Sequence, residues 1–453
     1  MSTTAAEVPP LPAAPLPPIL LSNVPGTWAY DTMSRRLRDD ILKRIYDEND
    51  MEKSPELKEA KEGLDALIAE MSHPETSKVC LYSVMVFKVA RFGASAEEDG
   101  GPEVAEWNEV MAPFFGKNWL DAPWLYAEFY AYRRLMEAIG YFKTGGLLAG
   151  FDPFANQKML GVTSALDSME TLSERLLSSP DMTFEAGVSL YLSTALWGNR
   201  MDLSLWPVAS SGGVVERASE DVFAQILAAG GANLLADATA AVSAVLSKAR
   251  AAGGARIDVV VDNAGFELFC DLCLADFLIG SGAASEVVLQ LKGHPTFVSD
   301  AMAKDMMAMV DHLAGLKGRE DGHYGAAAAV GERWRGLIAS GKWILKEDFF
   351  WAQPHPFWEM QWCLRTELSS QSALVVVKGD ANYRRLLGDR SWDPTTPFDA
   401  VASYFPTRLC ALRTLKAEVG CGMAAADVAR AKGEDVRWMV SGRWGVIQFF
   451  DPF

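Results

Sequence analysis

Basic residues and histidines are scarce in this sequence. Its 453 residues include 42 Lys and Arg against 59 Asp and Glu, which gives a formal net charge of -17 at pH 7, and only five His. Nucleic acids and anionic membranes are bound through a basic surface, which a net acidic protein lacks. We therefore expect neither as a partner, although a few converging Lys and Arg side chains can still hold a small anion.

Cysteines and long apolar runs are also few. The six cysteines, at positions 80, 270, 273, 363, 410 and 421, are too dispersed for a disulfide scaffold. Cys270-x-x-Cys273 has no second Cys or His pair at ligand spacing, so we interpret it as core packing. No secretory signal opens the chain, and no apolar run approaches the roughly 20 residues of a membrane-spanning helix. These absences predict a cytoplasmic protein, with the nucleus as the alternative compartment.

The composition divides the chain into three segments. Residues 1–24 are rich in Pro and Ala, which predicts a flexible tail. Residues 25–250 show mainly helical spacing of apolar residues and include an Ala-rich stretch, 221–250, that suggests a helix pair. Gly253-Gly254 marks a boundary, and residues 251–453 have the alternating pattern of an α/β domain. An apolar fraction of 49% is ample for a sizeable core.

A β-branched run in the last segment predicts a buried strand with polar residues at its end. Residues 257–261 read Ile-Asp-Val-Val-Val, and Asp262-Asn263-Ala264-Gly265 then breaks into an apolar, helix-like stretch. Two later runs, 287–291 and 374–377, are followed by Asp300 and by Asp380 in the same way.

These strand ends predict one shared site. In open α/β sheets, ligands bind at the carboxyl ends of the strands, where helix N-termini converge. Oxygen ligands from Asp262, Asn263, Asp300 and Asp380 suit a hard or borderline divalent cation. The alternative for each residue taken alone is a helix N-cap, the commonest role of Asp and Asn before a helix.

Four motifs resemble the signature segments of the damage-control phosphatases, formerly a domain of unknown function. They are Asp262-Asn263-Ala264-Gly265-Phe266-Glu267, Phe297-Val298-Ser299-Asp300, Lys378-Gly379-Asp380-Ala381-Asn382-Tyr383-Arg384 and Arg413-Thr414-Leu415-Lys416. The Arg-Thr-x-Lys element points to one subgroup of that family. Trp197 to Ser204 extends the resemblance, which covers roughly residues 25–453.

The resemblance implies a fold, an activity and a set of site residues. The fold is a Rossmann-like α/β/α domain preceded by a largely α-helical domain. The activity is metal-dependent hydrolysis of small sugar phosphates, such as fructose 1-phosphate or fructose 6-phosphate, with Mn, Ni, Co or Mg as the cofactor. Asp262, Asn263 and Asp300 would carry metal binding and catalysis, and the substrate would contact Glu267, Asn199, Asp380, Asn382, Tyr383, Arg384 and Lys416.

Several of these residues have simpler interpretations. Glu267 lies in the first turn of the expected helix, where an acidic residue compensates the helix dipole. Asn199 and Asp202 follow an apolar helical run at a Gly-containing break, where helix termination and capping explain them equally well. Lys416 lies in an apolar segment and either extends its amine to the surface or, with Arg384, holds a phosphate.

Two other functions remain open at this stage. The subgroup has also been linked to S-adenosylmethionine-dependent methylation of protein carboxylates, but no Gly-x-Gly loop follows the first strand. A catalytically silent metabolite-binding protein is the third alternative. Against it, several like charges are costly to bury without a cation.

Overall fold

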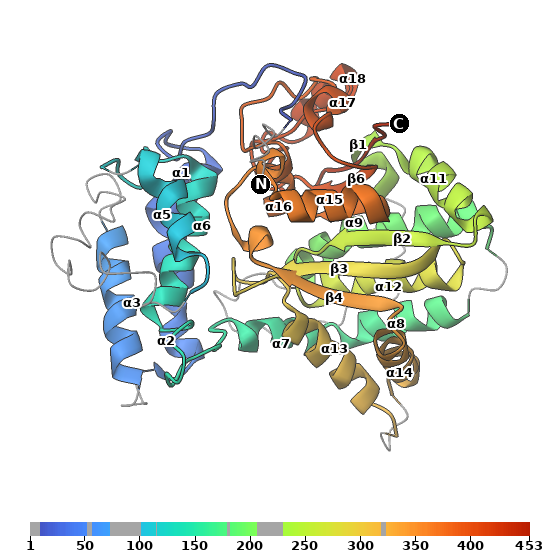
Figure 1. Ribbon diagram of the computed structural model, residues 1–453, viewed down its shortest axis with the longest axis horizontal. Coiled ribbons are helices and arrows are strands. Elements are labelled where there is room, and N and C mark those ends of the chain that lie inside the picture. The colour runs from blue at the N-terminus through green and yellow to red at the C-terminus, as the bar shows by residue number, and fades with distance from the viewer. Residues whose placement is uncertain are drawn as a thin grey trace, which may run out of the picture.

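The computed structural model contains a helical unit beside an α/β unit built on one sheet (Figure 1). It describes residues 10–51, 57–72, 101–114, 116–178, 182–205, 230–318 and 323–453, except for the side chains of residues 199–205. Within these ranges, no helix is both long and apolar enough to cross a membrane.

The sheet has seven strands in the order β1-β7-β6-β5-β2-β3-β4. The strands are β1 (Leu234–Asp237), β2 (Ala255–Val260), β3 (Ala284–Lys292), β4 (Trp343–Asp348), β5 (Ser372–Lys378), β6 (Leu409–Thr414) and β7 (Gly445–Phe450). Strands β6, β5, β2, β3 and β4 are parallel, whereas β7 runs antiparallel to β6. The chain adds β3 and β4 on one side of β2 and then returns to place β5 on its other side.

Helices cover both faces of the sheet, because alternate residues of each parallel strand are apolar on both faces. Val259 and Val376 face one core, and their neighbours Val260 and Val377 face the other. The first core packs against α8 (Leu166–Leu177), α9 (Phe184–Leu205), α11 (Thr239–Ala251), α12 (Phe266–Gly280), α13 (Ala303–Gly315) and α14 (Gly325–Ala339). The second packs against η5 (Phe349–Ala352), η6 (Phe357–Glu359), α15 (Trp362–Gln371), α16 (Asp380–Leu386), α17 (Phe398–Ala402) and α18 (Ala425–Glu434).

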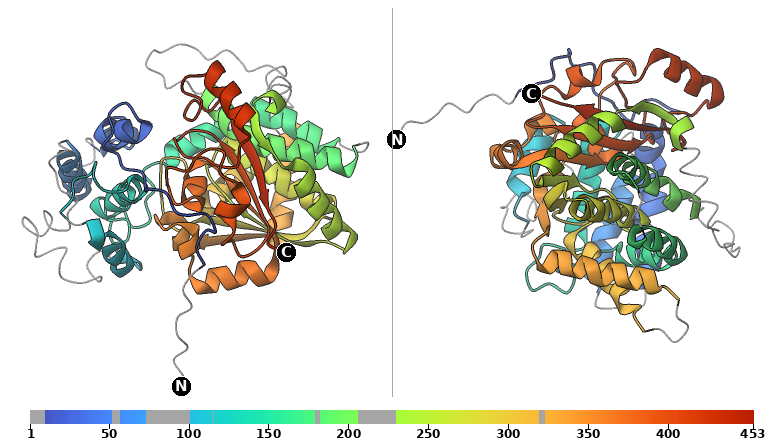
Figure 2. Two further views of the ribbon diagram at one scale, coloured as in Figure 1. Left: turned by 90° about the horizontal axis from the view of Figure 1, so that it is seen from above. Right: turned by 90° about the vertical axis from the view of Figure 1, so that its right-hand side faces the viewer.

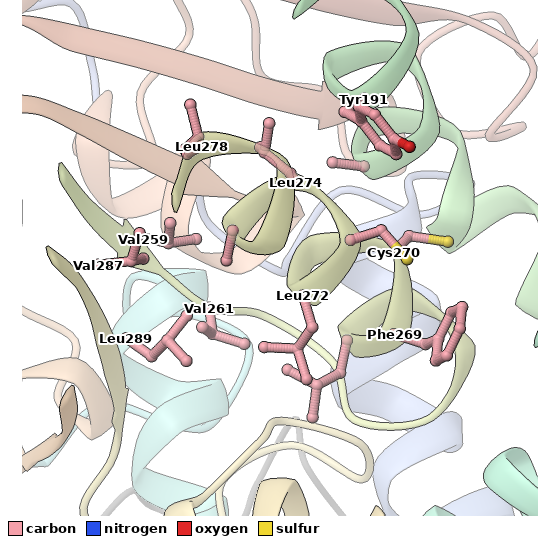
Figure 3. Packing of buried hydrophobic residues seen from close by; sticks show 14 of the residues in the cluster. Tyr191, Val259, Val261, Phe269, Cys270, Leu272, Leu274, Leu278, Val287 and Leu289 are labelled. Atoms are coloured by element: carbon pink, nitrogen blue, oxygen red, sulfur yellow. The ribbon is translucent and has the colours of Figure 1, made fainter. Parts of the chain in front are cut away.

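Helix α12 is the best-buried helix of the first core. Figure 3 shows Leu272 of α12 on the side of Val261 and Leu289, and Cys270 on the side of Tyr191 of α9. Cys270 and Cys273 are both buried as free thiols, which confirms their packing role. This apolar helix begins directly after the Asp262 to Gly265 turn and so holds that turn in place.

The helical unit has its own core and contacts the sheet's carboxyl edge. Its helices are α1 (Trp28–Asp31), η1 (Thr32–Leu42), α2 (Arg44–Glu48), α3 (Lys58–Met71), α5 (Val104–Met111), η4 (Ala112–Phe114) and α6 (Trp124–Ala138). Phe297, from the loop after β3, inserts between Phe129 and Tyr132 of α6, with ring centroids 4.9 and 5.0 Å away. Ala417, after β6, is buried in the same core. The helical unit therefore lies beside the strand ends.

The boundary expected near residue 250 is wrong. Helices α7 (Ala155–Thr163), α8, α9 and α11 all contribute to the core on one face of the sheet, and β1 lies within the sheet. The α/β unit therefore begins about a hundred residues earlier. The helical spacing of these segments was real, but they are the covering layer of an α/β/α fold. β1 also interrupts the expected helix pair, whose first part, residues 221–229, lies outside the described ranges.

The expectation of a flexible tail over residues 1–24 is also wrong from residue 10 onward. Leu20 donates its backbone N–H to Asp389 O (2.9 Å) and accepts from Trp124 N (2.9 Å), and Ala14 N donates to Ala400 O (3.1 Å). This strand-like segment runs from the helical unit over the α/β unit, as the dark blue trace in Figure 2 shows. Proline lacks an N–H, but its neighbours still bond to the domain.

Candidate functional site

The site lies where the strand order reverses. β2 and β5 are neighbours, and the chain leaves β2 toward β3 but leaves β5 toward β6. Loops that diverge in this way leave a crevice at the carboxyl ends of the two strands, which is the usual ligand site of such sheets. Asp262 follows β2, and Gly379 and Asp380 follow β5.

Backbone pairing brings Asp262, Asn263 and Asp300 together. Ala264 N donates to Ser299 O (2.6 Å), and Ala301 N donates to Asp262 O (2.8 Å), so residues 263 and 300 form an isolated antiparallel bridge. The loop after β3 is thereby fixed against the loop after β2. The grouping expected from the sequence is present, with Asp380 across the crevice on α16.

The two carboxylates are buried in an environment that disfavours their charge. Asp262 and Asp300 are 4% and 2% exposed. Burial, with the charges of Glu267 and Asp300, raises the pKa of Asp262 well above its usual value. Burial also raises the pKa of Asp300, despite the opposing charge of Lys292. A bound cation would relieve both effects.

Two buried lysines that sequence reasoning missed supply part of the compensation. Lys292, the last residue of β3, pairs with Asp300 (Nζ to Oδ2, 3.1 Å) and donates to Trp351 O (2.8 Å). Lys378, the last residue of β5, pairs with Glu267 (3.2 Å) and Asp271 (3.1 Å). A signal was present, because both strands end in Lys-Gly. The sequence alone does not single out these lysines, because a lysine at a strand end is usually exposed to solvent.

Glu267 is enclosed by protein groups. Its side chain is fully buried between Lys378 and Asn263, whose Nδ2 donates to Glu267 Oε2 (2.7 Å). In the structure Glu267 contacts Asn263 and Lys378, and its contact with the substrate stays a prediction. The two observed contacts arise because the first turn of α12 directs position 267 under the turn that precedes it.

Asp380 and Arg413 fix the segment that carries Lys416. Asp380 Oδ1 accepts from Arg413 Nε (2.8 Å) and from the backbone N–H of Lys416 (3.3 Å). The apolar segment that contains Arg413 is strand β6, and Lys416 lies just beyond its end, half-buried. The charge of Lys416 lowers the pKa of Asp262, against the larger effect of burial.

Three expected substrate contacts on α16 are directed into the protein. Asn382 donates to Val261 O (3.2 Å) and Lys378 O (2.9 Å), and Tyr383 OH donates to Gln448 Oε1 (2.7 Å). Arg384 is buried against Glu128 (2.7 Å) and Asp389 (2.8 Å) and lies over the Trp124 ring. Each helical residue turns about 100°, so only the start of α16 faces the crevice. The expectation that Arg384 binds phosphate is wrong, because its guanidinium group is already paired with Glu128 and Asp389.

The side chain of Asn199 falls outside the described residues.

The donor set fits a hard divalent cation. Two buried carboxylates and an amide oxygen are ligands of the type that such ions prefer. The nearby lysines do not fully offset the cost of burying the Asp262 charge, because the pKa of Asp262 is still raised. Within the described ranges, no group of three His, Cys, Asp or Glu side chains is arranged for a metal. The fit therefore depends on Asn263 as the third ligand.

The fold and the crevice define a class: α/β proteins with a carboxylate and lysine site at a topological switch point. Residues 32–431 match the damage-control phosphatase ARMT1-like domain, and the chain belongs to this family. Damage-control phosphatase ARMT1 from Rattus norvegicus is 34% identical over 74% of this chain and 75% of its own length. The namesake from Danio rerio is 31% identical over 96% and 98%.

Two further proteins are similar to this chain at lower identity. The namesake from Homo sapiens is 29% identical over 97% of this chain and 100% of its own length. A solved DUF89-family protein from Pyrococcus horikoshii aligns with 82% of this chain and 96% of its own, at 16% identity and a TM-score of 0.42.

Proposed function

We propose that this protein is a metal-dependent phosphomonoester hydrolase that acts on small sugar phosphates. The observation that carries the proposal is the convergence of Asp262, Asn263 and Asp300 at the switch point, with Lys416 just beyond β6, where its backbone N–H bonds to Asp380. Membership of the damage-control phosphatase family supports it. Fructose 1-phosphate and fructose 6-phosphate are the substrates we expect.

Each side chain has a distinct task in this proposal. Asp262, Asn263 and Asp300 would hold Mn, Ni, Co or Mg, which when bound polarises the phosphoryl group. Lys416 would bind a phosphate oxygen by charge, and Asp380 and Arg413 would keep the Lys416 segment in place. Asp262 would either attack phosphorus or accept a proton from the attacking water. Phosphoryl transfer depends mainly on positioning and charge neutralisation, which this arrangement suits.

A single panel tests the proposal. Phosphate release is measured from a series of sugar phosphates with each divalent metal and with chelator, alongside transfer of a labelled methyl group from S-adenosylmethionine. Metal-dependent phosphate release that is absent in Asp262→Asn is the expected result. Methyl transfer without phosphate release would contradict the proposal in favour of a methyltransferase, and ligand binding without either reaction would favour a silent binding protein.

A further inference from the structure

The amide of Asn263 is held by three partners. Its Nδ2 donates to Asp262 Oδ2 (3.0 Å) and to Glu267 Oε2 (2.7 Å), and its Oδ1 accepts from Ser299 Oγ (2.6 Å). The Glu267 carboxylate, paired with Lys378, accepts hydrogen bonds, so the amide must turn its nitrogen toward Glu267. The oxygen is then directed to the loop that carries Ser299 and Asp300.

Glu267 is itself held in place. Its Oε1 pairs with Lys378 Nζ, which also pairs with Asp271 and donates to Ala195 O of α9. All these side chains are buried. Burial alone lowers the pKa of Lys378, but the charges of Asp271 and Glu267 raise it above its usual value, so the lysine is a fixed cation. The chain of contacts runs from α9 through Lys378 and Glu267 to Asn263.

We infer that Glu267 and Lys378 are positioning residues that fix the Asn263 amide with its oxygen available as a metal ligand. This inference rests on the metal site of the proposed function. A carboxylate at position 267 accepts from Lys378 with one oxygen and from Asn263 with the other. Neither residue needs to touch the metal or the substrate.

The substitution Glu267→Gln tests this orientation. Glutamine has one acceptor oxygen, which the Lys378 cation takes, so its NH2 group faces Asn263. Asn263 must then rotate and present its oxygen to the new amide, away from the Asp300 loop. Partners of metal ligands typically contribute 10- to 100-fold to metal affinity, so we expect the Mn²⁺ affinity measured by calorimetry to fall by about 10- to 100-fold.

Asp271→Asn is the matched control. Measured at a pH well above the Asp271 pKa, which burial raises to about 7, this substitution also removes a negative charge beside Lys378 (3.1 Å). Asp271 makes no hydrogen bond to Asn263 among those described. We expect its Mn²⁺ affinity to stay near that of the unsubstituted protein. An equal loss in both variants would contradict the inference, because a charge effect would then suffice.

A background with Asn263→Asp separates orientation from charge. Aspartate has two equivalent oxygens, so one can accept from the amide that Glu267→Gln introduces while the other remains a ligand. Glu267→Gln should therefore lower Mn²⁺ affinity far less in the Asn263→Asp background than in the natural one, a non-additivity that an unchanged charge effect would not give. Equal losses in the two backgrounds would overturn the inference. If the unsubstituted protein binds no divalent metal, the proposed function fails as well; melting temperatures show that each variant is folded.

Discussion

Gly379 lies against the Asp262 carboxylate so closely that a Cβ added at position 379 would be 1.8 Å from Asp262 Oδ2. Its φ of +85° and ψ of 174° fall in a region that is essentially restricted to glycine. Gly379 thus lets β5 end directly beside the residue that follows β2. The close approach of the two strand ends depends on this missing side chain.

Replacing Gly379 with Ala should therefore disrupt both stability and the site. Strained backbone and overpacking together predict a loss of about 2 to 5 kcal/mol in the free energy of unfolding, measured in urea, and loss of phosphatase activity. Gly282→Ala is the control, since Gly282 has a similar φ of +76° but nothing within 4 Å of an added Cβ. It should lose only about 1 to 2 kcal/mol and keep its activity. Equal losses would show that backbone strain alone matters.

Lys416→Met should impair catalysis with little effect on stability. Loss of a preorganised charged contact to the phosphate typically removes about 2 to 4 kcal/mol of transition-state stabilisation, or roughly 30- to 1,000-fold in kcat/KM. The methionine keeps the stem's packing, so we expect the melting temperature to stay nearly unchanged. Lys317→Met, which removes an exposed lysine after α13, is the control. Wild-type kcat/KM in Lys416→Met would remove this lysine from the site.

Asp300→Asn should destabilise the metal-free protein because it leaves Lys292 as an unpaired buried cation. Breaking such a pair costs about 3 to 5 kcal/mol, and adding Lys292→Met should recover most of that loss. Both variants should lose Mn²⁺ binding. Unfolding in urea with chelator measures the first effect and calorimetry the second. If the double variant were no more stable than Asp300→Asn, the Lys292 pair would not be the cause.

His294 should make stability fall in acid. Burial, with the charge of Arg133, lowers its pKa from 6.5 to about 3 in the folded protein. As the pH falls, the unfolded chain therefore takes up a proton at this histidine before the folded protein does. The contribution of His294 to the free energy of unfolding is complete above pH 6.5 and is lost as the pH falls from 6.5 toward 3, by up to about 1.4 kcal/mol per pH unit. His294→Asn keeps a donor for Pro295 O (3.1 Å) and should flatten this part of the curve. Parallel curves for the two proteins would contradict the assignment.

Truncation of residues 1–21 should destabilise the protein. It removes the backbone hydrogen bonds of Ala14 and Leu20 and the bond from Arg390 to Pro17 O (2.7 Å). At about 1 kcal/mol each, these contacts predict a loss of a few kcal/mol, seen as a lower melting temperature. Truncation of residues 1–9 breaks none of them and is the control. An unchanged melting temperature in the longer truncation would show that residues 10–21 do not stabilise the fold.

The sequence by itself determined the central strands and the acidic residues at their ends. The runs at 257–261, 287–291 and 374–377 form strands, apart from Val261, which follows β2, because β-branched residues that are apolar on both faces leave little alternative. Since parallel strands deliver their ends to one edge, Asp262, Asn263 and Asp300 could be grouped without coordinates. The α/β/α class and the family were predictable on the same residues.

Only the tertiary structure decided which charges face one another. Lys292 and Lys378 became part of the site, and Arg384 left it, through partners that are far away in sequence: Lys378 pairs with Glu267, and Arg384 with Glu128. The limits of the α/β unit were hidden for the same reason, because a helix that covers a sheet has the same periodicity as one in a bundle. Local pattern specifies an element and its buried face, whereas ion pairing and layer assignment depend on which distant element the fold brings against it.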